Sequence, residues 1–268
     1  MNAKLIRPLG RLLGNLFPDL AAEMARRLAT RPIGRRRRPD PEGAMPVTFR
    51  FGLAGLRWGH GGPTVLALHG WEGRAAQFRG LGERLARRGY QLIALDAPAH
   101  GRSPGAEADP VVFADALQEV AAEVGPLHAV VGHSMGGASA LYALSRGLDS
   151  ARGVAIAAPA GLVGVLARMS RALGLPEEAR RRFFAKMHSR TGVAPEALDI
   201  DLVANGLAQR VLVVHDRDDR IIPFADAERI ARATRGELHA TRGLGHRDVL
   251  RDGDVLDHIV GFLAPRAA

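Results

Sequence analysis

Residues 129–144 read AVVGHSMGGASALYAL and place Ser134 between two glycines, after an apolar run and before a stretch with helical character. The Gly-x-Ser-x-Gly pattern alone is a weak signal, because a chain this rich in glycine produces it by chance in roughly one sequence in ten. Its setting strengthens it, since a sharp strand–turn–helix elbow needs small residues beside the serine. Gly132 and Gly136 occupy those places. The stretch therefore predicts a serine at the tip of a strand, either as a nucleophile or as an ordinary turn residue.

Apolar runs alternate with helical patterns along most of the chain. The runs that predict strands are 64–70, 91–98, 127–134, 151–159 and 210–216. Short, fully apolar strands separated by helices indicate an α/β fold, with a mostly parallel sheet covered by helices on both faces. Residues 160–209 hold helical patterns and no strand-like run, so we expect a small helical cap there. The predicted parts are an N-terminal helical segment at 1–44, a core at 45–160 and 210–268, and a cap at 161–209.

Positive charge is concentrated at the N-terminus. The formal net charge is +9, and residues 1–44 carry ten basic and four acidic side chains, a balance of +6. Apolar side chains recur there at helical spacing, namely Leu5, Leu9, Leu12, Leu13, Leu16, Leu20, Met24 and Leu28. Two interpretations follow: an arm that contacts a membrane surface or a partner, or a helical flap packed on the domain, with a solvated arginine loop at 31–43. Few aromatic residues lie between the arginines, so nucleic acid is not an expected partner.

The sequence lacks several other functional signals. The chain has no cysteine, which excludes disulfides and thiolate chemistry. No histidine or carboxylate spacing suggests a metal site, and no glycine-rich dinucleotide motif follows a strand, so neither a metal nor a cofactor is expected. No apolar stretch suits a membrane span or a signal peptide. We expect a cytoplasmic protein, with membrane association through residues 1–44 as the alternative; the oligomeric state stays open.

A serine nucleophile needs a base and a carboxylate that orients the base. His246 is the best placed of ten histidines, because it sits in a glycine-flanked loop between a strand predicted at 238–241 and the final helix. The segment 211–223 reads VLVVHDRDDRIIP and carries three aspartates just after a strand. Because the carboxyl ends of parallel strands meet at one edge of a sheet, we expect these side chains to gather near Ser134.

Five motifs, taken in order, resemble those of the α/β-hydrolase superfamily of serine hydrolases. They are LALHGW (66–71), LDAPAHGRS (95–103), GHSMGG (132–137), DRDDRIIP (216–223) and GLGH (243–246). Ala99 and Asp216 stand where the family has glycine. The resemblance runs from about residue 48 to the C-terminus and implies the α/β-hydrolase fold. His69 and His100, which lie inside two of these motifs, are expected to serve the hydrogen bonding of their loops.

The resemblance also implies a catalytic triad. Ser134 would attack an acyl carbon, His246 would take its proton, and Asp219 would orient the imidazole. Asp218 remains the alternative orienting acid. The implied oxyanion hole consists of the backbone N–H groups of Trp71 and Met135, while Gly132 and Gly136 form the elbow.

We therefore expect a serine hydrolase whose partner is a small-molecule ester and whose acyl chains are small to medium in size. A thioesterase, a lipase or a carbon–carbon hydrolase on the same triad remains an alternative. So does a non-catalytic binding protein built on a hydrolase scaffold.

Overall fold

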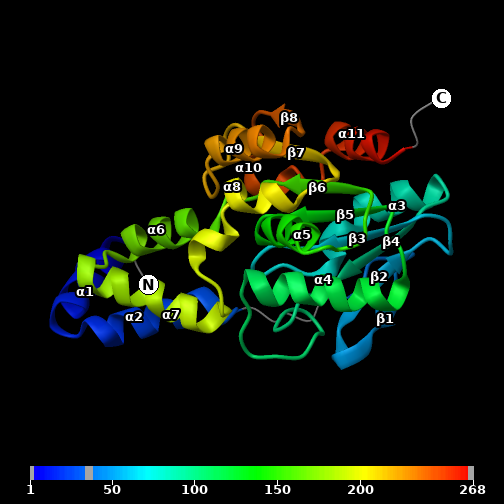
Figure 1. Ribbon diagram of the computed structural model, residues 1–268. Coiled ribbons are helices and arrows are strands. Elements are labelled where there is room, and N and C mark those ends of the chain that lie inside the picture. The colour runs from blue at the N-terminus through cyan, green and yellow to red at the C-terminus, as the bar shows by residue number, and fades with distance from the viewer. Residues whose placement is uncertain (1–2, 34–38, 265–268) are drawn as a thin grey trace.

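An eight-stranded sheet runs through the middle of the molecule in the computed structural model, which describes residues 3–33 and 39–264 (Figure 1). The strands are β1 (Met45–Thr48), β2 (Ala54–Trp58), β3 (Thr64–Leu68), β4 (Gln91–Leu95), β5 (Ala129–His133), β6 (Arg152–Ile156), β7 (Arg210–Asp216) and β8 (Glu237–Thr241). Their order in space is β1-β2-β4-β3-β5-β6-β7-β8. β2 pairs antiparallel with β1 and β4, and all the other pairs are parallel. The predicted mostly parallel sheet is confirmed.

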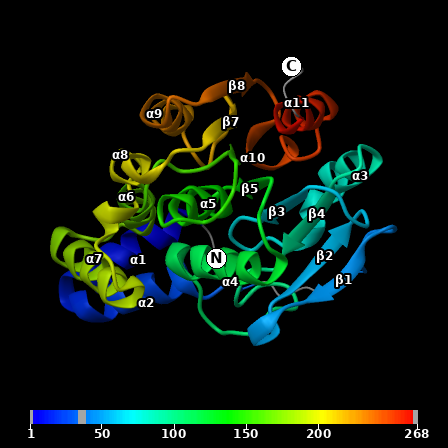
Figure 2. The ribbon, with the colours of Figure 1, turned by 45° about the vertical axis from the view of Figure 1, so that its right-hand side comes forward.

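Helices cover both faces of this sheet. They are α3 (Arg79–Arg87), α4 (Pro110–Val124), α5 (Met135–Ser145), α9 (Phe224–Thr234), α10 (Gly245–Asp248) and α11 (Gly253–Leu263), with short 3-10 turns η1 (Arg50–Gly52) and η2 (Ala75–Phe78). Figure 2 shows α3 and α11 on one side of the sheet and α4 and α5 on the other.

Alternate residues of each central strand pack into different cores. In β3, Val65 and Ala67 join the cluster formed with α3 and α11, while Leu66 and Leu68 join the cluster of α4 and α5. All four side chains are fully buried. Because successive side chains of a strand point to opposite faces, a strand covered on both sides needs apolar residues at every position. This explains the uninterrupted apolar runs in the sequence.

Helices also fill the connection between β6 and β7, as predicted. They are α6 (Leu162–Leu173), α7 (Glu177–Thr191), η3 (Pro195–Leu198), α8 (Ile200–Val203) and η4 (Ala204–Gly206). The N-terminal helices α1 (Ala3–Leu16) and α2 (Pro18–Thr30) lie beside α6 and α7 at one end of the molecule (Figure 1). Ala22 and Ala25 of α2 share an apolar cluster with Leu166, Phe183 and Met187. The N-terminal helices therefore help to form the core of this helical layer.

Ion pairs fasten the end of α2 to the rest of the chain. Glu107, just before α4, accepts from Arg26 at 2.9 Å and from Arg31 at 2.7 Å. Residues 34–38 of the predicted arginine loop lie outside the described residues. Within 3–33 and 39–264, no helix combines the length and apolar character that crossing a bilayer requires.

Candidate active site

Ser134 occupies a sharp turn between β5 and α5. Its φ is +52°, in the left-handed region that a residue with a side chain rarely adopts. The backbone N–H of Ser134 donates to the carbonyl oxygen of Ile156 in β6 at 2.8 Å, which holds the turn against the neighbouring strand. The half-buried side chain thus stands at the carboxyl edge of the sheet, where sites of parallel α/β sheets gather.

The glycines around the elbow are required by close backbone contacts. A Cβ at Gly132 would lie 2.2 Å from the carbonyl oxygen of Gly136, and a Cβ at Gly136 would lie 2.3 Å from that of Leu68. In the loop after β3, a Cβ at Gly70 would lie 2.7 Å from the Ser134 Cβ. Because these are backbone atoms or the nucleophile itself, none can move aside cheaply. The elbow and the loop after β3 fit together only with glycine at these positions.

Ser134, His246 and Asp219 form a continuous hydrogen-bonded chain. The His246 Nε2 lies 3.0 Å from the Ser134 Oγ, and the His246 Nδ1 lies 2.7 Å from the Asp219 Oδ2. A carboxylate can only accept, so Nδ1 carries a proton and the neutral ring presents its Nε2 lone pair to the serine hydroxyl. This geometry gives the hydroxyl a base and the base an orienting anion.

Asp219 is buried yet held in its charged form. Burial alone would raise its pKa, but hydrogen bonds from His215, His246 and the backbone outweigh burial and hold the pKa well below its ordinary value. The backbone N–H groups of Ile221 and Ile222 donate to its Oδ1 at 2.8 and 3.0 Å. On the other oxygen, the His215 Nε2 approaches to 3.4 Å. The carboxylate thus enters the His246 hydrogen bond already ionised and fixed in direction.

The two neighbouring aspartates hold the histidine loop instead of contacting its ring. The Asp216 Oδ2 accepts from the Thr241 hydroxyl at 2.8 Å and from the Leu244 N–H at 3.0 Å. Asp218 accepts from the Gly243 N–H at 3.0 Å. Both therefore tie the end of β7 to the segment that follows β8. The sequence offered Asp218 as the alternative orienting acid, and it did not show that these two aspartates position the histidine loop.

His246 itself lies in the one-turn helix α10, a correction to the predicted open loop. The buried ring of His133, next to Ser134 in the chain, donates from Nε2 to the His246 carbonyl oxygen at 2.8 Å. Burial and the nearby His246 lower the pKa of His133 to about 3, so this ring is neutral. Sequence reasoning gave His133 no role, because the contact joins residues more than one hundred positions apart.

The loop that follows β3 is braced by two neutral histidines. The His69 Nδ1–H donates to the Gly70 carbonyl at 2.7 Å, and its Nε2 accepts from the Ala97 N–H at 3.0 Å. The His100 Nε2 accepts from the Glu72 N–H at 3.1 Å. Both histidines thus serve loop hydrogen bonding, as predicted.

Trp71 lies within this braced loop, next to the glycine that faces Ser134. Its backbone N–H has no acceptor among residues 3–33 and 39–264. Met135 is the first residue of α5, where the backbone N–H groups of a helix have no partner within the helix. Met135 thus adjoins Ser134 in the chain, and Trp71 adjoins Gly70, the glycine whose Cβ position lies 2.7 Å from the Ser134 Cβ.

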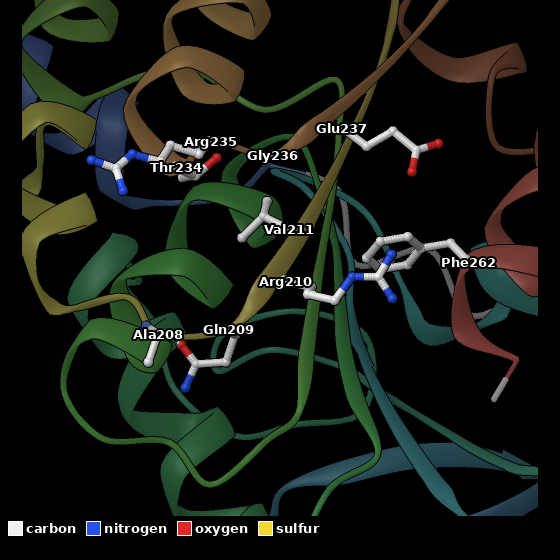
Figure 3. A pocket seen from close by; sticks show the side chains of 9 residues that line it. All are labelled: Ala208, Gln209, Arg210, Val211, Thr234, Arg235, Gly236, Glu237 and Phe262. Atoms are coloured by element: carbon white, nitrogen blue, oxygen red, sulfur yellow. Dashed lines mark hydrogen bonds between the residues drawn. The ribbon is translucent and has the colours of Figure 1, made fainter. Parts of the chain in front are cut away.

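A cavity of about 440 Å³ opens elsewhere on the molecule. Arg210 at the start of β7, Glu237 at the start of β8 and Phe262 near the end of α11 line it (Figure 3). These positions mark the amino edge of the parallel strands, whereas Ser134 stands at the carboxyl edge. The cavity is therefore separate from the triad. The described residues contain no group of three or more histidine, cysteine or acidic side chains that could hold a metal ion.

Comparisons with known proteins agree with this architecture. A family model described as the alpha/beta hydrolase fold matches residues 63–198, just over half of the chain. A pimeloyl-[acyl-carrier protein] methyl ester esterase of Xanthomonas oryzae pv. oryzae is 34% identical over 128 residues, which are 48% of this chain and 46% of the relative. The chain thus spans about half the length of the curated relative that it matches.

Solved structures share the fold over a larger part of the chain. An esterase from Pyrococcus furiosus has a TM-score of 0.62 at 21% identity, covering 82% of this chain and 89% of the other. The thioesterase domain from the curacin biosynthetic pathway has a TM-score of 0.61 at 17% identity, covering 82% and 98%. At these identities the likeness concerns the fold alone.

Proposed function

The chain belongs to the α/β-hydrolase fold family, and from this premise we propose that it is a serine hydrolase cleaving carboxylic esters of small to medium acyl chains. One observation carries the proposal: the chain of hydrogen bonds from the Asp219 carboxylate through His246 to the Ser134 hydroxyl. Two of these residues lie outside the stretch that the family model matches, so their contact supports the proposal independently of that match.

The proposed reaction proceeds through an acyl-serine intermediate. The Ser134 Oγ attacks the ester carbonyl carbon while its proton passes to the His246 Nε2. The oxyanion formed on the carbonyl oxygen accepts hydrogen bonds from the backbone N–H groups of Trp71 and Met135. The imidazolium, stabilised by Asp219, then protonates the departing alkoxide, and the alcohol leaves. Water attacks the acyl-serine by the same route in reverse and releases the acid.

In this proposal, the helices between β6 and β7 form one side of the pocket that binds the acyl group. We assign residues 161–209 to a cap, residues 45–160 and 210–268 to the catalytic core, and residues 1–44 to an N-terminal segment. A thioesterase, a lipase or a carbon–carbon hydrolase would use the same triad. The name of the curated relative includes a methyl ester, and a substrate panel should therefore contain methyl esters beside p-nitrophenyl esters and acyl thioesters.

Hydrolysis of p-nitrophenyl acetate and butyrate tests the proposal. Ser134→Ala should abolish turnover above background, and a fluorophosphonate probe should label Ser134 in the unaltered chain but not in His246→Ala. Ser139→Ala is the matched control, because Ser139 lies on α5, is fully buried and has no hydrogen-bond partner for its hydroxyl among the described residues. Retained turnover in Ser134→Ala would exclude it as the nucleophile. An unlabelled, inactive wild-type chain would favour a non-catalytic binding protein.

A further inference from the structure

The two N-terminal helices turn their small residues toward the body of the protein. A Cβ at Gly10 of α1 would lie 1.9 Å from the carbonyl oxygen of Leu173, and one at Gly14 would lie 2.4 Å from the Pro176 ring. On α2 the buried residues are mainly alanines, Ala21, Ala22 and Ala25. Helices approach each other this closely only where the facing side chains are small. The closest contacts of α1 with the body of the protein are therefore made at glycines, and the buried face of α2 consists mainly of alanines.

Most of the large apolar side chains of these helices face solvent instead, although Ile6 and Leu13 are half-buried. The α1 row consists of Leu5, Leu9, Leu12 and Leu16, each between 56% and 63% exposed. Their spacing places them on one face of the helix. A similar row on α2 begins at Leu20 and ends at Leu28. An ordinary surface helix has the opposite arrangement, with its large apolar residues against the core.

The two rows meet at the corner between the helices. Leu16 ends the first row and Leu20 begins the second, and the Phe17 ring between them in the chain is 57% exposed. Of the twelve large apolar side chains exposed in the described part of the chain, nine fall within residues 5–33. This patch lies on a peripheral pair of helices (Figure 1). An apolar patch of this extent marks an interaction surface.

Charge indicates what covers the patch. Arg7 and Arg11 are exposed on α1 and have no acidic partner among the described residues. The side chains of Arg27 and Arg31 remain more than half exposed although each pairs with a glutamate. With a balance of +6 in residues 1–44, a second copy of the chain would bring like charges face to face. An anionic surface would complement the arginines while its apolar interior accepts the leucines.

We propose that α1 and α2 form a membrane-binding surface for anionic phospholipid, with the leucine rows in the acyl boundary and the arginines among the headgroups. The segment just after α2 also reaches the loop after β3, because the Ile33 N–H donates to the Glu72 carboxylate at 3.1 Å, one residue after Trp71. A bound lipid surface would therefore lie next to the loop that faces Ser134. The binding itself requires no catalytic activity and is tested without it.

Vesicle flotation of the full chain tests the proposal. Wild type should float with phosphatidylcholine vesicles that contain phosphatidylglycerol, and less with phosphatidylcholine alone. Leu9→Ser/Leu12→Ser/Leu16→Ser should bind at least about 100-fold more weakly, because three buried leucines are lost. Arg7→Gln/Arg11→Gln should weaken binding about tenfold or more on the anionic vesicles only. All replaced side chains are exposed, so thermal unfolding should remain near that of wild type.

Phe51→Ser/Leu202→Ser is the matched control, because these side chains are 74% and 56% exposed outside the N-terminal helices. Its vesicle binding should equal that of wild type. Absence of wild-type binding to anionic vesicles, or equal binding by the leucine variant, would overturn the proposal. A third result would also overturn it: light scattering shows a dimer of the wild type but not of the leucine variant, and the wild type does not bind vesicles. A second copy of the chain would then cover the patch.

Discussion

The substitution Asp219→Asn tests whether Asp219 orients His246 through its carboxylate or only packs in the site. The Asp219 Oδ1 accepts the N–H groups of Ile221 and Ile222, at 2.8 and 3.0 Å, so these donors hold the amide oxygen of an asparagine at that position. The amide NH₂ then faces the His246 Nδ1, which lies 2.7 Å from the present Oδ2. Two donors cannot share one hydrogen bond, and the imidazole must move its proton to Nε2.

The consequence for catalysis is large because Nε2 loses its lone pair. His246 can then no longer take the Ser134 proton, although the shape of the site is kept. A wrong tautomer of this kind lowers kcat by about 10,000-fold. At about 1.4 kcal/mol for each factor of ten, this is roughly 5.5 kcal/mol of barrier. The oxyanion donors remain in place and should leave a residual rate above that of water.

The assay is the steady-state hydrolysis of p-nitrophenyl butyrate, with thermal unfolding measured on the same samples. Asp218→Asn is the control, because the Asp218 Oδ2 accepts the Gly243 N–H and no other donor within 3–33 and 39–264, and an amide oxygen can still do so. Its kcat should stay within about threefold of wild type. If Asp219→Asn kept a tenth of the wild-type kcat, or if Asp218→Asn fell as far, the assignment of the orienting acid would be wrong.

Three predictions concern stability. Lowering the pH from 7 to 5 should reduce the free energy of unfolding by about 2 kcal/mol for each of His69 and His133. Burial lowers both pKa values to about 3, whereas the unfolded rings take up protons near pH 6.5. A free energy of unfolding in urea that does not change over this pH range would contradict the prediction. Gly136→Ala should destabilise the protein by about 1–3 kcal/mol. Gly261→Ala, on α11 with nothing within 4 Å of a new Cβ, should instead stabilise it by up to about 1 kcal/mol. Equal melting temperatures of the two variants would refute the argument from close contacts. Arg235→Gly should stabilise the protein by about 0.5–1 kcal/mol, because Arg235 caps the C-terminus of α9 with a φ of +52°, which glycine adopts more easily. An unchanged or lower melting temperature would contradict this prediction.

The sheet could be predicted because its information is local. Each apolar run is a strand buried on both faces, and the run itself carries that signal. Four of the five predicted runs are longer than their strands, whereas the run 210–216 coincides with β7. The segment 64–70 becomes Thr64–Leu68, because His69 already serves the following loop. The one-turn helix α10 could not be predicted, because its four residues are too few to show a helical period.

The candidate site also has a part that the sequence predicted and a part that it did not. Ser134, Asp219 and His246 were predicted from motifs, and the structure brings their side chains into contact, while their catalytic roles stay predictions. The supports of the site could not be found from the sequence. The hydrogen bond that His133 donates to the His246 carbonyl depends on how distant segments pack. The hydrogen bond that Asp216 accepts from Thr241 depends on the pairing of β7 with β8. No spacing of residues encodes either contact.

The N-terminal helices show why a hydrophobic period alone does not settle which side of a helix is buried. Four of the leucines of α1 share one face, which predicts an amphipathic helix but leaves open whether that face meets the protein or something outside it. A second pattern in the same residues carries the missing information. Gly10 and Gly14 also recur at helical spacing on a different face, and only such a face allows the backbone of α1 to reach residues 173–176. Where a helix has one row of small and another of large apolar residues, close packing selects the small row. The large row is then left for a partner outside the fold.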